Sequence, residues 1–167
     1  RYMAFASNAS NLVPDDTNAS TDVFVYDRQT CAVGRVSLSS AEVEADGPSS
    51  SPSISDDGRY VAFASAATTF GSPFFPDTNG ARDVFVRDRQ AGITILASAA
   101  ATGNWANAES GSAAMSGDGR TLAFLSLATD LVSGDTNGLW DVFVRDLENS
   151  TTTRASVVSG GIQGVGG

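Results

Sequence analysis

Asp83-Val84-Phe85-Val86-Arg87-Asp88 decides the fold, because the chain contains this stretch three times. It returns unchanged at 141–146 and with one replacement, Tyr26 for Arg87, at 22–27. The copies begin 61 and 58 residues apart, and a second marker, Arg-x-x-Ala-Phe, begins at Arg1, Arg59 and Arg120. Repetition at a nearly fixed spacing is typical of tandem units that pack on their neighbours. We therefore interpret the chain as three copies of one unit.

Composition favours an all-β protein. The 167-residue chain has a net charge of −9, and all ten of its basic residues are Arg. Nucleic acid is bound by Lys and Arg clusters, so this charge argues against a nucleic-acid partner. Fifteen Asp against four Glu indicate strands joined by ordered turns, because Asp favours turns and Glu favours helices. No segment shows a helical period or a membrane-spanning apolar run.

Each complete copy is predicted to contain four short antiparallel strands. In the second copy they lie at about 52–55, 60–65, 83–88 and 93–98. Asp57-Gly58 predicts a tight hairpin turn between the first two strands. The return strands, at 33–38, 93–98 and 152–157, are rich in β-branched residues and are expected to be the more exposed ones. Ser-, Ala- and Gly-rich links at 39–51 and 99–112 separate the copies.

Four-stranded sheets repeated along a chain are the blades of a β-propeller. The copies define one propeller segment with blade units of about 1–51, 52–112 and 113–167, and the first unit lacks its Asp-Gly strand. Propellers close with about four to eight blades, and an open row leaves bare sheet edges. We therefore expect further blades, supplied by the same chain or by a second copy of it.

A family resemblance supports this interpretation. The Ser-x-Asp-Gly-Arg-x-x-Ala-Phe pattern at 55–63 and 116–124 resembles the hallmark of TolB-like (WD40-like) propeller repeats. The Asp-Val-Phe-Val-Arg-Asp stretch is similar to the strand that follows it in that family. Asp56 and Gly117 depart from the family, which usually has Pro there, and the spacing of 58 exceeds the family's. The resemblance implies a six-bladed ring and a secreted or periplasmic bacterial protein.

Catalysis is not expected in this chain. It contains no His, so Ser-His-Asp and Cys-His schemes and His-ligated zinc are excluded within it. Cys31 is its one cysteine, which excludes an internal disulfide. Most Asp residues return in register in every copy, whereas an active site normally breaks repeat symmetry. The alternative is a carbohydrate-active propeller, a glycoside hydrolase or polysaccharide lyase, with a carboxylate pair in the central channel.

The loop before each Asp-Val-Phe-Val strand is a candidate calcium site. Its Asp-x-Asn-Gly-x-x-Asp pattern supplies oxygen atoms at positions 1, 3 and 7, which suits Ca²⁺. The candidate ligands are Asp77, Asn79 and Asp83, then Asp135, Asn137 and Asp141, and in the first copy, where Ala19 replaces Gly, Asp16, Asn18 and Asp22. In the alternative interpretation these side chains bond the backbone of the turn and hold the next strand without an ion.

Three aromatic residues are candidates for a contact surface. Phe74 and Phe75 lie in an insertion of the second copy, and Trp105 lies in the long link that follows it. Exposed aromatic side chains are typical of surfaces that bind a protein or polysaccharide ligand. The alternative is that they pack over a blade edge. Together these observations predict a non-enzymatic extracellular or periplasmic propeller module that serves in binding or as a scaffold, with structural calcium as a candidate cofactor.

Overall fold

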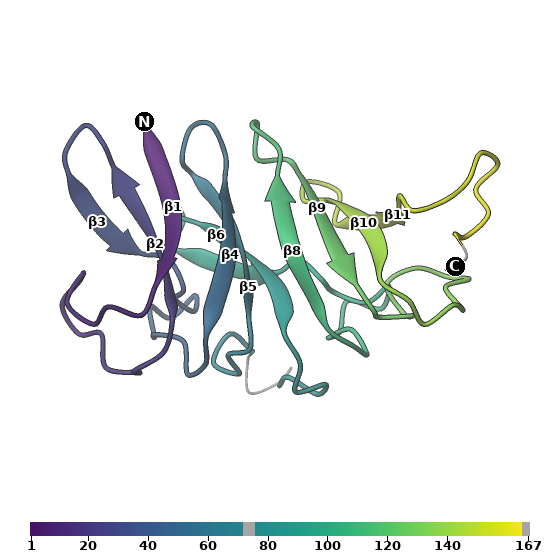
Figure 1. The fold of residues 1–167 in the computed structure, drawn as a ribbon, viewed down its shortest axis with the longest axis horizontal. Helices are drawn as coiled ribbons and strands as arrows, with labels where there is room; N and C mark the ends of the chain where they lie inside the picture. The colour runs from purple at the N-terminus through teal and green to yellow at the C-terminus, as the bar shows by residue number, and fades with distance from the viewer. Residues whose placement is uncertain (72–75, 165–167) are drawn as a thin grey trace.

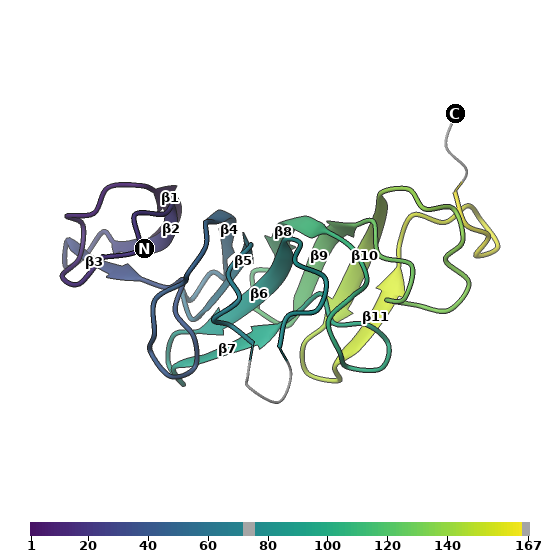
Figure 2. The ribbon, with the colours of Figure 1, turned by 90° about the horizontal axis from the view of Figure 1, so that it is seen from below.

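A computed structural model describes residues 1–71 and 76–164 of the chain. These residues form eleven β-strands in three antiparallel sheets and contain no helix. The sheets stand side by side in chain order, with the first and the third sheet at opposite ends of the row (Figure 1). Figure 2 shows the same row turned by 90°, again as three separate sheets. The prediction of an all-β fold with one sheet per copy is confirmed.

Each sheet is a meander in which strands adjacent in sequence are adjacent in space. The first sheet contains β1 (Tyr2–Ser7), β2 (Asp22–Asp27) and β3 (Ala32–Arg35). The second contains β4 (Ser49–Ile54), β5 (Tyr60–Ser65), β6 (Asp83–Asp88) and β7 (Ile93–Leu96). The third contains β8 (Ser110–Met115), β9 (Thr121–Ser126), β10 (Asp141–Asp146) and β11 (Thr151–Arg154).

Two strand boundaries differ from the prediction. The return strands end two or three residues earlier than predicted. In the second sheet the amides of Ala97 and Ser98 both donate to the carbonyl of Val84, at 2.8 and 3.2 Å, so the regular pairing of the two strands cannot continue, and the other two sheets have the equivalent bonds. The first strands of the second and third sheets, β4 and β8, begin earlier than predicted, at Ser49 and Ser110. Hydroxyl bonding holds these Ser-rich starts, as in the buried Ser49–Ser65 pair at 2.9 Å, and apolar patterning cannot reveal it.

Equivalent Phe residues occupy equivalent places in the three sheets. Each pairs across the sheet with the Phe of the Ala-Phe strand, and the ring centroids are 5.7, 6.0 and 5.8 Å apart in the three copies. Phe24, Phe85 and Phe143 are each at most 1% exposed. The repeat in the sequence is therefore a repeat in packing, with one stacked aromatic pair at the centre of every sheet.

The core lies between the sheets. One apolar cluster joins the first and second sheets through Val23, Val61 and Phe63, and another joins the second and third through Ala62 and Phe124. Successive residues of β5 enter opposite clusters, as the two-residue period of a strand requires. The second sheet is thus covered on both faces, which explains its near-continuous apolar strands.

Candidate functional site

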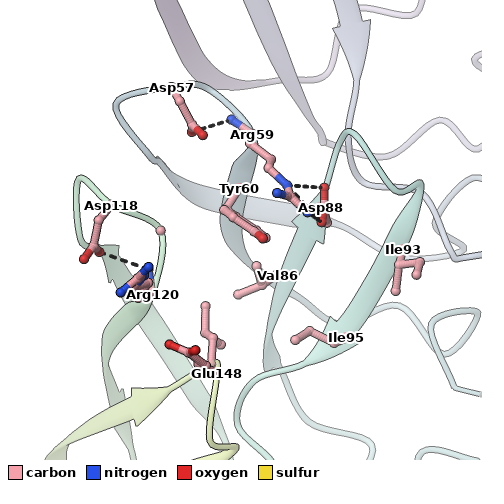
Figure 3. A pocket seen from close by; sticks show the side chains of 12 residues that line it. Asp57, Arg59, Tyr60, Val86, Asp88, Ile93, Ile95, Asp118, Arg120 and Glu148 are labelled. Carbon is pink, nitrogen blue, oxygen red and sulfur yellow. Dashed lines mark hydrogen bonds and ion pairs between the residues drawn. The ribbon is translucent and has the colours of Figure 1, made fainter.

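A pocket of about 520 Å³ lies between the second and third sheets, at the end that carries the Asp-Gly turns (Figure 3). Apolar and aromatic side chains form its walls: Tyr60, Val86, Ile93 and Ile95 from the second sheet, and Leu147 from the third. Charged residues complete the lining, namely Asp57, Arg59, Asp88, Asp118, Arg120 and Glu148. The pocket therefore combines an apolar surface with ionised groups, as ligand sites commonly do.

Two of these carboxylates are fixed by their own turns. The hydroxyl of Ser55 donates to Asp57 over 2.6 Å, and the backbone amide of Arg59 donates to the same carboxylate over 2.9 Å. Asp118 accepts the equivalent bonds in the third sheet, at 2.6 and 3.0 Å. These hydrogen bonds hold the pKa of both carboxyls below the usual range, so both are ionised at neutral pH.

Glycine in each turn makes room for a tyrosine of the preceding sheet. Gly119 has a φ of +71°, and a Cβ atom there would lie 2.4 Å from the ring of Tyr60. Gly58 stands in the same relation to Tyr2, with a φ of +75° and 2.0 Å. Because both the backbone conformation and the close approach exclude a side chain, the turn fixes the position of the Tyr60 ring in the pocket wall.

The two guanidinium groups of the pocket differ in their partners. Arg59 donates to both oxygens of Asp88, from Nε at 3.0 and 3.1 Å and from Nη2 at 2.6 Å, which lowers the pKa of that carboxyl. Its guanidinium also lies over the ring of Tyr60, 4.7 Å from the centroid. In the third sheet the amide of Asn149 binds the equivalent carboxylate, Asp146, over 2.9 Å. Within the described part of the chain, the Arg120 guanidinium makes no hydrogen bond or ion pair.

The predicted calcium loops form one repeated hydrogen-bond arrangement. The amide nitrogens of Asn18, Asn79 and Asn137 donate to the carboxylates of the next strand, over 2.9, 3.2 and 3.1 Å. Each also donates to a backbone carbonyl of the following link, as Asn79 does to Ala106 over 2.7 Å. The structure thus brings the predicted residues together, with each Asn acting as a donor that holds the loop against the strand.

In the first and third copies an arginine faces the carboxylate pair. The guanidinium of Arg35 lies 3.4 Å from Asp16 and 3.7 Å from Asp22. Arg154 lies 3.4 Å from Asp135 and 4.0 Å from Asp141. The positive charge at these two loops is therefore supplied by the chain itself.

In the described part of the second copy, no arginine takes this position. Leu96 stands where the other copies have Arg35 and Arg154, and Trp105 stands where the first copy has Glu44, the partner of Arg35. Burial raises the pKa of Asp83 to about 6, although hydrogen bonds from Ser98 and Asn79 oppose this, and the charges of Asp77 and Asp130 add to it. Among residues 1–71 and 76–164 there is no group of three acidic, His or Cys side chains suited to a metal.

The predicted aromatic surface is not formed by Trp105. Its side chain is 9% exposed and packs edge-on against Phe85 at 5.8 Å, so the prediction of an exposed ring there is wrong. Trp105 takes the place of Glu44 on the bridge that the link forms in every copy, and its ring packs into the apolar cluster that contains Phe85. Phe74 and Phe75 lie outside the described residues. Ile93 and Ile95, 48% and 44% exposed, are the apolar surface that the sequence reasoning missed.

A signal for these two isoleucines is present in the sequence. The equivalent positions are Ala32 and Gly34 in the first copy, and both are Thr in the third, so only the second return strand has large apolar side chains at these two positions. In the half-exposed outer strand of a sheet, such a departure from the repeat indicates a surface with a function of its own.

The three sheets are consecutive blades, and the described chain is a partial β-propeller. It is similar to the structure of a protein assigned as TolB from Agrobacterium tumefaciens, with a TM-score of 0.54 and 15% identity over 92% of this chain and 44% of that one. It is also similar to the tricorn protease, with a TM-score of 0.50 and 14% identity over 95% of this chain and 12% of that one. At these identities the likeness shows the fold alone. No family model and no curated protein matches the chain.

The chain spans less than half the length of the TolB structure that it matches. Over the residues that the structure describes, no helix is long and apolar enough to cross a membrane.

Proposed function

We propose that the chain is part of a TolB-like, secreted or periplasmic propeller that binds a protein ligand and performs no catalysis itself. The observation that carries the proposal is the pocket between the second and third blades. Its apolar wall includes Ile95, which is 44% exposed although it lies beside the core, and its charged rim is held by fixed turns. Such a combination supports recognition of a partner that has both apolar and charged groups.

The outer face of the third blade supports the proposal that more blades follow. Val142 is 37% exposed, whereas the equivalent Val23 and Val84 are 0% exposed because the next blade covers them. Trp140, beside it, is 48% exposed. We propose that a further blade of the same kind covers this face, from the same chain or from a second copy. The mass of the particle in solution tests this, because a stable 17.1 kDa monomer would leave the face uncovered.

Calcium is proposed for the second copy alone. Arg35 and Arg154 supply the positive charge in the other two loops, whereas Asp77 and Asp83 face no guanidinium among the described residues. Two carboxylates are few for Ca²⁺, which takes about six to eight oxygen ligands, so most of its ligands would be water. Bound there, the ion would neutralise the loop and would have no part in recognition.

Photo-cross-linking tests the binding function. A photoreactive residue at Ile93 is compared with one at Thr151, the equivalent and also exposed position of the third blade. We expect a discrete adduct from Ile93 that excess unmodified protein suppresses, and no such adduct from Thr151. Identical patterns at both positions would contradict binding at the pocket. Release of sugar from a polysaccharide panel by the purified protein would favour the carbohydrate-active alternative instead.

A further inference from the structure

The contact between the first and second blades shows what fills the space that corresponds to the pocket. Arg89, which follows β6, reaches across to the first blade. Its guanidinium lies 5.2 Å from the ring centroid of Tyr2 and donates to the carbonyl of Gly58 over 2.6 Å. The guanidinium of Arg1 also lies over the Tyr2 ring, 4.8 Å from its centroid, so this ring contacts two guanidinium groups.

The contact between the second and third blades has the same parts except for that arginine. Tyr60 corresponds to Tyr2, Gly119 to Gly58, and Leu147 to Arg89. Tyr60 has its own Arg59 at 4.7 Å, and within the described residues no second guanidinium contacts it. The shorter, uncharged Leu147 leaves open a space that Arg89 fills at the other contact, and the pocket of about 520 Å³ lies there.

The pocket is also more negatively charged than the equivalent contact between the first and second blades. Glu148 stands where the second blade has Gln90, and it follows Leu147, which stands where that blade has Arg89. The lining contains four carboxylates and two guanidinium groups, a net charge of −2. Arg59 is bound to Asp88, so Asp57, Asp118 and Glu148 outnumber Arg120 at the rim. Figure 3 shows the Glu148 carboxylate and the Tyr60 ring within the same pocket. A positively charged ligand would balance this excess.

We propose that the pocket binds an arginine side chain of a protein partner, in the position that Arg89 takes at the preceding contact. The inference rests on the proposed binding function and specifies its ligand. The guanidinium stacks on Tyr60 and donates to the Gly119 carbonyl, and Glu148 offsets its charge. The aliphatic stem lies along Leu147 and Ile95. Arginine fits better than lysine, because a planar guanidinium both stacks on a ring and donates several hydrogen bonds.

Matched probes and variants test the proposal. N-acetyl-arginine amide is titrated into the purified protein, and N-acetyl-citrulline amide, which has nearly the same shape without the charge, serves as the control. Binding is followed by the NMR shifts of the Tyr60 ring and the Arg120 amide. We expect saturable shifts with the arginine probe and about tenfold weaker binding of the citrulline probe, because the charge-assisted bonds and the cation–π contact are lost.

Two substitutions exchange the roles of the two contacts. Leu147→Arg introduces the missing guanidinium and is expected to abolish binding, whereas Leu147→Met, similar in volume, preserves it. Arg89→Leu opens the first contact and is expected to create a second site, reported by the Tyr2 ring. Glu148→Gln should weaken binding by about two- to fivefold. A Leu147→Arg variant that binds the probe as well as the wild type would overturn the proposal.

The outcomes separate this inference from the proposed function. Equal binding of both probes, with Leu147→Arg still blocking them, would refute the arginine specificity and leave the pocket as a binding site. If the arginine probe binds but the photoreactive residue at Ile93 forms no adduct, the partner-binding function is refuted instead. Circular dichroism of each variant establishes that it is folded before its binding is interpreted.

Discussion

Asp83→Asn is expected to stabilise the protein at neutral pH, although it removes a residue that is present in all three copies. Asp83 is 0% exposed, and no arginine among the described residues faces its carboxyl. Its pKa is raised from 3.8 to about 6, mainly by burial. Each pKa unit corresponds to about 1.4 kcal/mol, so the ionised carboxylate costs the folded state up to about 3 kcal/mol at pH 7.

The sign of the pH dependence follows from this shift. A raised folded-state pKa means that the contribution of the group to stability is fully present below the unfolded pKa, near 3.8, and is lost as the pH rises through about 6. The amide of Asn resembles the protonated carboxyl, because its oxygen can accept from Asn79 and its nitrogen can donate to the hydroxyl oxygen of Ser98. The gain should therefore be about 1 to 3 kcal/mol at pH 7.5 and close to zero at pH 4.

The matched control is Asp22→Asn in the first copy. Asp22 is equally buried, but Arg35 lies 3.7 Å from it, so its removal takes a partner from a buried guanidinium. We expect a loss of about 1 to 3 kcal/mol. Urea unfolding with a chelator present, at pH 7.5 and pH 4, measures both variants. If Asp83→Asn loses as much stability as Asp22→Asn at pH 7.5, the assignment of an uncompensated buried charge to the second copy is refuted.

Two further predictions concern the loops and the turns. Millimolar Ca²⁺ should raise the melting temperature of the wild type above its value in a chelator. Leu96→Arg should remove this increase, because the new guanidinium takes the place of the ion. An unchanged increase in the variant would show that the ion binds elsewhere. Gly119→Ala should destabilise by about 1 to 3 kcal/mol in thermal unfolding, because of its positive φ and its contact with Tyr60. Gly34→Ala, with no atom within 4 Å, should change stability by less than about 0.5 kcal/mol, and equal effects would contradict the account.

The architecture could be predicted from the repeat, because the same apolar pattern occurs in three copies and each copy must pack in the same way. The sequence predicts three copies of one unit, and Phe24, Phe85 and Phe143 accordingly form the same stacked pair in each sheet. The start of β4 was not predicted, because its order comes from Ser49 and a bulge between Ser50 and Ser53 and not from apolar alternation. Hydroxyl pairs of this kind have no periodic signature in the sequence.

The site was harder to predict than the fold, because it depends on contacts between copies. Asp77, Asn79 and Asp83 were predicted to lie together, and they do so. Whether a cation belongs there depends on the residue that faces them from β7, nineteen positions after Asp77, and local spacing does not reveal that partner. The pocket likewise joins Ile95 to Leu147 across two blades, and it becomes visible only when the sheets are placed side by side.

Two departures from the repeat therefore locate the distinctive chemistry of this chain. At both, a leucine stands where an equivalent position has arginine: Leu96 against Arg35, and Leu147 against Arg89. The first loss is compensated only in part, since Trp105 also replaces Glu44 and packs into the core, whereas Asp83 is left as a buried carboxylate without a cation among the described residues. The second loss is not compensated, since Glu148 adds negative charge beside an open space. A residue that opens a space and removes a cation, with no compensating residue nearby, reduces stability. This cost is the physical reason for proposing a ligand that supplies the missing group.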